Sequence, residues 1–218
     1  MRTGLIAAVL VLLPLLHVST LAGSESSDTY FPLKQGMTWT YEIISDKHPT
    51  KKITITNLPP REIDNLKLTP RKTEAGGSTT YFLIGSDDKG IYRYGEQKSE
   101  SSEPIIAQPR DYYIKNPAGV GTTWDTTTKL GPEEVTINLT IEGVTDGVTA
   151  PAGAFKDCLK IKSMGGNQKK DSPLTLEAYD WYAPKVGLVK SMVTITRVEE
   201  DQKKNSEHLT YQLDSFKP

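Results

Sequence analysis

The stretch "EVTINLTIE", residues 134–142, decides the fold class, because apolar and polar side chains alternate along it without a break. Val135, Ile137, Leu139 and Ile141 fall on one side of an extended chain, and threonine and asparagine fall on the other. Alternation with a period of two is typical of a β-strand with one buried and one solvated face. Such strands occur in antiparallel sheets that pack one face on a core.

The same alternation recurs along the chain, and no stretch has the period of about 3.6 residues that a helix requires. "TWTYEII" (38–44) places Trp39 and Tyr41 on one side, and "HLTYQLDSF" (208–216) repeats the pattern. Further candidate strands are 51–58, 81–85, 90–94, 155–162, 176–182 and 187–195. So many strands exceed what a flat sheet accommodates, so we predict an all-β fold with a strongly curved antiparallel sheet, as a barrel, half-barrel or sandwich.

Turn-forming residues separate several of these strands. Asp87 and Asp88, followed by Gly90, predict a hairpin between the strands on either side of them. Asp146 and Gly147 predict a second tight turn by the same chemistry.

The first residues have the pattern of a secretory signal. Arg2 precedes an uncharged apolar run at 5–16, and small residues follow it. The run is too short for a membrane-spanning helix, which needs about 20 apolar residues. We expect cleavage between Ala22 and Gly23, so that 1–22 is a signal peptide. Residues 23–29 are then expected to be a disordered start, and 30–218 a single antiparallel β domain.

A lipid anchor is not expected at this cleavage site. Residues 21–23, Leu-Ala-Gly, resemble the run before the lipid-bearing cysteine of bacterial lipoproteins, but Ser24 replaces that cysteine and has no thiol to acylate. The single cysteine, Cys158, excludes an internal disulfide. It is either a buried bystander or, if it shares an open strand face with Lys160, a reactive thiol. We therefore expect an exported protein, periplasmic or extracellular.

Composition excludes several function classes. The chain has 26 basic and 27 acidic residues, and only one of these, Arg2, lies in the expected signal peptide. A nearly balanced charge gives no electrostatic attraction to nucleic acid or anionic lipid. His48 and His208 are far apart and show no zinc-ligand spacing. No nucleophile motif is present, so we expect neither a metal, nor a cofactor, nor catalysis.

Two eight-residue segments share Pro, Gly, Thr and Trp at identical spacing. They are "PLKQGMTW" (32–39) and "PAGVGTTW" (117–124). One interpretation is an internal duplication in which each half opens with a turn that leads into an aromatic strand. The other is a local device used twice, in which Pro and Gly shape the turn and Trp fills the core.

Aromatic residues on the expected strands are the candidates for ligand binding. One face of the sheet should pack the core, and the other could line a groove for an apolar or glycan ligand. The competing interpretation is a sheet stabilised by cross-strand aromatic pairs. The candidate ligand-binding residues are Trp39, Tyr41, Trp124, Tyr179 and Trp181.

Three segments together resemble a group of poorly characterised bacterial envelope proteins, many of them lipoproteins. The segments are "YFPLKQGMTWTYEI" (30–43), "APAGAFKDCLKIK" (150–162) and "DWYAPKVGLVKS" (180–191). In that group they correspond to FPL-x-x-G-x-x-W-x-Y, PAG-x-F-x-x-C-x-x-I and YAP-x-x-GL-V. The resemblance implies a half-barrel or barrel-like sheet, similar to lipoprotein-carrier-like envelope proteins, and brings no catalytic residues. The matched positions are Pro32, Gly36, Trp39, Tyr41, Pro151, Gly153, Phe155, Cys158, Tyr182, Pro184 and Gly187.

These observations favour an exported, non-catalytic cell-envelope protein that binds an apolar or glycan ligand on a curved, aromatic-lined sheet. The alternative is a structural or assembly protein of the envelope that contacts partner proteins through sheet edges or loops and holds no small ligand. A remote alternative is a hydrolase, which would require two of Glu142, Glu177 and Asp180 to converge. No partner nucleic acid and no membrane span are expected.

Overall fold

The computed structural model describes residues 26–218, except 131–132, 168, 170–172 and 199–202. The expected signal peptide, its cleavage site at Ala22 and Gly23, and Ser24 lie outside the described residues. Within the described part of the chain, no helix is long and apolar enough to cross a membrane.

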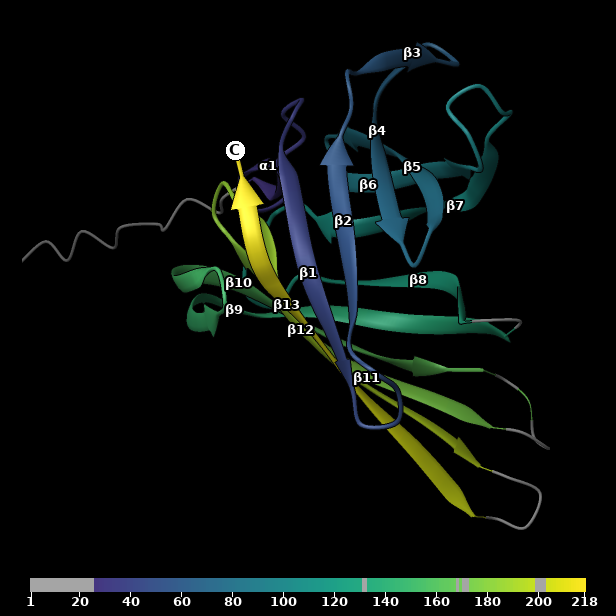
Figure 1. Cartoon of the computed structure of the whole chain (residues 1–218), viewed down its shortest axis with the longest axis vertical. Coiled ribbons are helices and arrows are strands. Elements are labelled where there is room, and N and C mark those ends of the chain that lie inside the picture. The colour runs from purple at the N-terminus through teal and green to yellow at the C-terminus, as the bar shows by residue number, and fades with distance from the viewer. Residues whose placement is uncertain (1–25, 131–132, 168, 170–172, 199–202) are drawn as a thin grey trace, which may run out of the picture.

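The described residues form one short helix and thirteen strands (Figure 1). Their bounds are α1 Ser27–Tyr30, β1 Thr38–Ser45, β2 Lys51–Asn57, β3 Arg61–Ile63, β4 Leu66–Ala75, β5 Ser78–Asp87, β6 Gly90–Gln97, β7 Ile105–Lys115, β8 Thr123–Leu130, β9 Glu133–Ala150, β10 Gly153–Gly166, β11 Leu174–Ala183, β12 Gly187–Val198 and β13 Lys204–Lys217.

The strands make one antiparallel sheet that curls into a nearly closed barrel shape. Its order is β7-β6-β5-β4-β2-β1-β13-β12-β11-β10-β9-β8, with β3 attached to β4. Two consecutive meanders, β1–β7 and β8–β13, are joined where β1 pairs with β13. Figure 1 shows the sheet wrapping round, so that β1 and β2 pass across the view over β8 and β9. The predicted all-β, strongly curved, barrel-like single domain is confirmed.

The two end strands, β7 and β8, meet at a seam that completes the barrel shape. No ladder pairs them among the described residues, but side chains bridge the seam. The Trp124 indole Nε1 donates to the carbonyl of Tyr112 at 2.9 Å, and the Thr126 hydroxyl donates to the Asp111 carboxylate at 2.5 Å. The sheet is therefore closed by side chains at one end of the seam.

The alternation that predicted the strands is reflected in their burial. In β9, Val135 and Ile141 are fully buried while Thr136 and Asn138 are exposed. The predicted hairpin at 87–90 is present, with Asp87 paired to Gly90.

The turn predicted at Asp146 and Gly147 is wrong. Both residues lie inside β9, which continues to Ala150 before the chain reverses ahead of Gly153. Gly153 takes the positive φ of 138° that a glycine tolerates. The turn chemistry of Asp-Gly is overridden here because Asp146 pairs with Cys158 in a bulged ladder.

Two strands that the sequence pattern did not predict, β4 and β7, each contain a proline. Pro70 lies where β4 passes from its pairing with β2 to its pairing with β3, so no ladder partner is lost on that side. Pro109 lies in the edge strand β7, in a stretch where the ladder to β6 is interrupted. Both positions are ones where a strand tolerates a missing N–H.

The segment before β1 closes one end of the barrel. The backbone N–H of Ser27 donates to the Asn116 side chain at 2.9 Å, and that of Lys185 donates to the Thr29 carbonyl at 2.7 Å. Ser27 is fully buried in the first turn of α1. The disorder expected for 23–29 is therefore wrong for Ser27–Thr29, because these tertiary hydrogen bonds order the backbone.

The two similar segments occupy equivalent places in the two meanders. Each contains a glycine with positive φ, Gly36 or Gly121, and leads into the first strand of its meander. Trp39 and Trp124 are both buried, and each indole N–H donates to a backbone carbonyl of another strand or loop. This is the placement that an internal duplication predicts, although the reuse of one local device predicts the same contacts.

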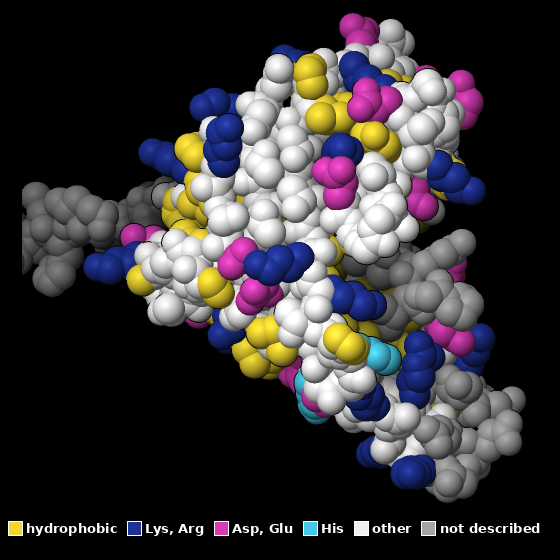
Figure 2. All heavy atoms as spheres, viewed as in Figure 1, with side chains coloured by type: hydrophobic (Ala, Val, Ile, Leu, Met, Phe, Trp, Pro, Cys, Tyr) yellow, Lys and Arg dark blue, Asp and Glu magenta, His cyan; other side chains and the backbone are white. Residues whose placement is uncertain are grey.

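Charged side chains of both signs are interspersed over the face seen in Figure 2. Toward the lower right of that view, Lys and Arg side chains outnumber the acidic ones.

Candidate functional site

The concave side of the sheet contains a pocket of about 440 Å³, within the size range of small-molecule sites. We call it the interior pocket. Its lining is mostly aromatic and aliphatic. The lining residues are Phe31, Pro32, Trp39, Tyr41, Ile53, Ile55, Arg71, Thr73, Phe82, Tyr113, Tyr182, Gly187, Leu188 and Tyr211.

Strand alternation places the pocket residues on one face. Tyr41 is directly opposite Ile53, and Ile55 is opposite both Trp39 and Thr73 in the ladders that join β1, β2 and β4. Directly paired residues of antiparallel strands share a face, so these side chains all turn to the concave side. The pocket is thus a consequence of register and curvature.

Aromatic rings cover the end of the pocket nearest the N-terminal segment. Phe31 stacks on Tyr113 with ring centroids 5.1 Å apart and is tilted against Tyr182 at 6.3 Å. Burial raises the pKa of Tyr113 to about 12 and that of Tyr182 well above its ordinary value. Both phenols are therefore neutral hydrogen-bond donors at any physiological pH.

Two predicted site residues, Trp39 and Tyr41, line the interior pocket. The Trp39 indole Nε1 donates to the carbonyl of Val186 at 2.6 Å, and the Tyr41 hydroxyl donates to the carbonyl of Leu188 at 2.8 Å. Their polar atoms are therefore occupied, and the apolar faces of the rings are what the pocket presents. Their role in ligand binding remains a prediction.

The remaining hydroxyl groups of the pocket are less constrained. Those of Tyr113, Tyr182 and Tyr211 make no hydrogen bond to any residue that the structure describes. None of the three phenol oxygens is completely buried. They can donate to a polar atom of a molecule held in the pocket.

Arg71 is the cationic residue of the interior pocket. Its Nε donates to the Asn57 side-chain oxygen at 2.9 Å, and its Nη2 donates to the carbonyl of Pro32 at 3.2 Å. The guanidinium carbon lies 4.2 Å from the ring centroid of Phe31 and 4.8 Å from that of Trp39. Burial lowers the pKa of Arg71, and nearby phenols oppose that shift.

Trp124 does not line the interior pocket. It is buried in the core beside the seam, and its role is to close the sheet through the hydrogen bond to Tyr112 described above. Trp124 lines neither the interior pocket nor the hollow along the seam, and its role in ligand binding remains a prediction.

Tyr179 and Trp181 lie on the opposite, convex face of the sheet. Their ring centroids are 6.3 Å apart, and the ammonium groups of Lys160 and Lys162 lie 4.9 and 5.6 Å from the Tyr179 ring. The Trp181 indole donates to Asp146 at 3.2 Å. The structure therefore does not bring the five predicted aromatic residues to one surface, because β11 carries aromatic side chains on both faces. Tyr179 and Trp181 lie on the same strand, β11, and their partners across the ladder to β10 are Lys162 and Lys160, so this outer group contains no cross-strand aromatic pair.

The three carboxylates of the hydrolase alternative lie on two faces of the sheet: Asp180 is apart from the other two, whereas Glu142 and Glu177 share a face and both raise the pKa of Lys162. Glu142 pairs with Lys160 at 3.1 Å, and Glu177 pairs with Lys162 at 3.8 Å, both on the convex face. Asp180 points to the concave side, opposite Ser191 in the ladder, and burial raises its pKa to about 6. The described residues contain no group of His, Cys, Asp and Glu able to hold a metal ion.

Cys158 is buried, as the bystander interpretation predicts. A bulge at Asp157, which has a φ of 53°, turns the thiol away from the lysines that alternation would place beside it. Burial, with Asp146 and Asp157 nearby, raises the pKa of the thiol to about 11. The thiol is thus protonated and inert at neutral pH.

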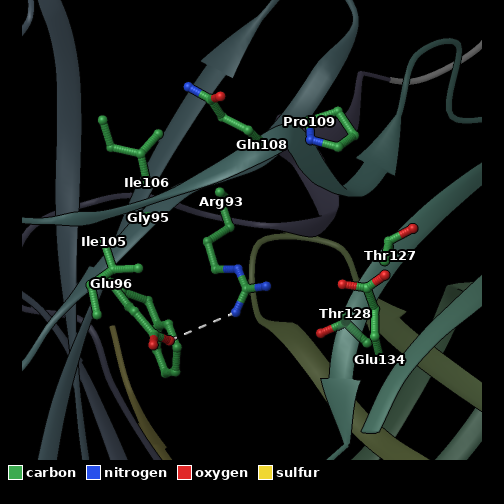
Figure 3. Close-up of a pocket in the computed structure, with 12 residues that line it drawn as sticks. Arg93, Gly95, Glu96, Ile105, Ile106, Gln108, Pro109, Thr127, Thr128 and Glu134 are labelled. Atoms are coloured by element: carbon green, nitrogen blue, oxygen red, sulfur yellow. Dashed lines mark ion pairs between the residues drawn. The ribbon is translucent and has the colours of Figure 1, made fainter.

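A second hollow of about 670 Å³ lies along the seam, and we call it the seam hollow. Figure 3 shows Arg93 pointing into it, with an ion pair to Glu96, while Thr128 and Glu134 lie on the facing side. Arg93 also pairs with Asp111 at 2.9 Å. Phe82 lines both the seam hollow and the interior pocket.

The aromatic and charged pocket residues that the sequence did not select are Arg71, Phe31, Phe82, Tyr113 and Tyr211; Tyr182 is an aromatic residue of a predicted strand but was not among the candidate site residues. The family motifs nonetheless pointed to the pocket. Five of their matched positions line it: Pro32, Trp39, Tyr41, Tyr182 and Gly187. Nothing in the sequence around Arg71 distinguishes it from a solvated strand residue.

Comparisons with known proteins name no activity. A family model described as DUF3108-like matches residues 128–208, which is less than half of the chain. No curated protein matches the chain.

Two solved structures are similar to it. A candidate exported protein with a YmcC-like fold from Bacteroides fragilis is 14% identical, with a TM-score of 0.47, covering 87% of this chain and 99% of that one. A candidate lipoprotein from Parabacteroides distasonis is 14% identical, with a TM-score of 0.46, covering 87% of this chain and 98% of its own. Both are too distant for their descriptions to be transferred to this chain.

Proposed function

We propose that the protein is an exported, non-catalytic binding protein of the cell envelope that holds an apolar ligand in the interior pocket. The observation that carries the proposal is the pocket itself, an open-sided hollow of about 440 Å³ lined mostly by aromatic and aliphatic side chains. A concave, largely apolar cavity with a few polar groups is the common form of a small-molecule site. The signal-like segment 1–22 supports export.

An apolar ligand is favoured over a glycan by the chemistry of the lining. Ile53, Ile55 and Leu188 offer no hydrogen bonds, and the polar atoms of Trp39 and Tyr41 are already bonded to the backbone. A sugar bound there could hydrogen-bond to Arg71 and the free phenols, but its hydroxyl groups that face Ile53, Ile55 and Leu188 would be unsatisfied, which costs free energy for each buried group. An apolar chain has no hydrogen bonds to lose when it moves from water into the pocket, and its burial there is favourable.

Filling the pocket tests this proposal. In Thr73→Trp an indole would occupy the pocket, whereas Glu74→Trp places the same group on the exposed face of the same strand. The neutral fluorescent probe N-phenylnaphthylamine should brighten with the wild type and with Glu74→Trp, and should stay dim with Thr73→Trp. Equal brightening in all three proteins, or none in the wild type, would refute the pocket as a ligand site.

A role in envelope assembly is the second candidate, and one observation favours it. Ile105 and Ile106 are 60% and 43% exposed, side by side at the start of the edge strand β7. Exposed apolar residues on an unpaired edge are a means of recruiting another protein. A photo-crosslinking residue at Ile105 should then capture a discrete partner in the envelope, while the same residue at Lys51 on the paired strand β2 captures none.

A further inference from the structure

Arg71 is a cation without a counter-charge. No carboxylate of the described residues lies within ion-pair distance of its guanidinium group. Arg93, which also points to the concave side, is paired with both Asp111 and Glu96. A charge in an apolar site is costly unless it is paired, so the absence of an acid beside Arg71 calls for an explanation.

The guanidinium group is held in place by a network of neutral acceptors. The Asn57 side-chain N–H groups donate to the carbonyls of Pro32 and Lys34, each at 3.1 Å, which turns the Asn57 oxygen toward Arg71. With the Pro32 carbonyl on Nη2, this network fixes two of the guanidinium nitrogens. Phe31 and Trp39 cover its faces. Arg71 is therefore oriented by its neighbours and not merely buried.

One edge of the guanidinium group is left for a ligand. Its Nη1 makes no hydrogen bond to any residue in the described part of the chain. The phenols of Tyr113 and Tyr182 lie close enough to affect its pKa, and their hydroxyls have no partner among the described residues. An arginine fork with neutral tyrosine donors beside it is suited to the oxygens of a carboxylate or phosphate group.

We infer that the ligand of the interior pocket is an apolar chain ending in a carboxylate or phosphate group, whose oxygens pair with Arg71. This rests on the proposed function, since the apolar chain is what the rest of the pocket would hold. The anion would supply the missing counter-charge while the chain lies against Ile53, Ile55 and Leu188.

The test compares ligands that differ only in the head group. Dodecanoate, dodecyl phosphate, dodecanol and dodecyltrimethylammonium are titrated into the wild-type protein below their micelle-forming concentrations. Charge-assisted hydrogen bonds predict that each anion binds about ten- to a hundredfold more tightly than dodecanol, and the cation more weakly. The tighter of the two anions distinguishes a fatty carboxylate from a lipid phosphate.

Variants of Arg71 test whether this residue causes the preference for anionic head groups. Arg71→Met should bring dodecanoate and dodecyl phosphate to within about threefold of dodecanol, because the charge-assisted bonds are gone. Lys72→Met, which removes a charge from the opposite face of the same strand, should leave the preference intact. Arg71→Lys keeps the positive charge but loses the planar, two-pronged guanidinium group, so it should retain only part of the preference for anions.

The outcomes separate this inference from the proposed function. Equal binding of dodecanol and the anions to the wild type would overturn the inference and leave an apolar pocket. Binding of none of the four would overturn both. Inorganic phosphate binding as tightly as dodecyl phosphate would also overturn the inference, because the chain would then contribute nothing. Since these comparisons use the wild type, they stand even if Arg71→Met does not fold.

Discussion

Asp180 shows how the curvature of the sheet alters a single side chain. On a flat sheet its carboxylate would be solvated, but here it points to the concave side and burial raises its pKa to about 6. The unfolded chain loses this proton at a lower pH than the folded protein does. Stability from this residue is therefore complete below the unfolded pKa and falls as the pH rises through the folded one.

Replacement by asparagine should remove this loss. We expect Asp180→Asn to be more stable than the wild type by about 2 kcal/mol at about pH 7, and close to it at about pH 4. Urea denaturation at both pH values measures the difference. The control is Asp214→Asn, which removes a carboxylate that is ion-paired with Lys52 and should not give this pH-dependent gain. A gain for Asp180→Asn that is equal at both pH values would contradict the assignment.

The sequence located part of the site at this scale. Trp39 and Tyr41 were identified because period-two alternation places them together on one strand face. Tyr179 and Trp181 share the same kind of pattern, yet they lie on the convex side. Alternation shows that two residues share a face of the sheet, but it does not show which face is concave. It also could not identify Arg71, because the role of Arg71 depends on residues that are far away in the sequence.

Among the strands, the β9–β10 hairpin depends on close backbone approach at Gly165. A Cβ added there would lie 2.0 Å from the Thr136 carbonyl oxygen and 2.7 Å from the Ile137 Cα, both on the paired strand. Backbone atoms of a ladder cannot yield without breaking hydrogen bonds.

We therefore expect Gly165→Ala to destabilise the protein by about 2 kcal/mol or more. In the same hairpin, Gly147→Ala should change stability by less than about 1 kcal/mol, since the nearest atom to its new Cβ is 3.9 Å away. Chemical denaturation of the two variants checks the contrast. Equal effects would show that the hairpin register in this region is not the one described.

Strand prediction failed where local chemistry and tertiary context disagree. Pro70 and Pro109 argue against strands by composition, but each lies where its ladder has a gap. Asp146-Gly147 argues for a turn, but long-range pairing with β10 extends the strand through it. Neither the gaps in the ladders nor the long-range pairing can be predicted from a few neighbouring residues of the sequence.

At the scale of the whole molecule, the two meanders meet at two junctions, and only one of these is joined by a backbone ladder. β1 and β13 pair along eight residues of β1, whereas β7 and β8 share no ladder in the described part of the chain. The number of strands predicted the curling of the sheet, but closure depends on side chains such as Trp124 and Asp111 that bridge the seam.

Unpaired edges should open more readily than paired ones. We expect amides of β8 that face the seam to exchange with deuterium at least about tenfold faster than those of β1 that face β13. Hydrogen exchange read by mass spectrometry on short peptides resolves the two strands. Equal protection would mean that the seam is as firmly joined as the β1–β13 junction, and that ligand access there requires a larger opening.

The most direct test of the central claim is native mass spectrometry of the protein purified from the envelope of the cells that produce it. We predict a bound mass that organic extraction removes and that is absent from Thr73→Trp but present in Glu74→Trp. A single mass equal to the bare chain in all three proteins would contradict a ligand-binding interior and favour the assembly role.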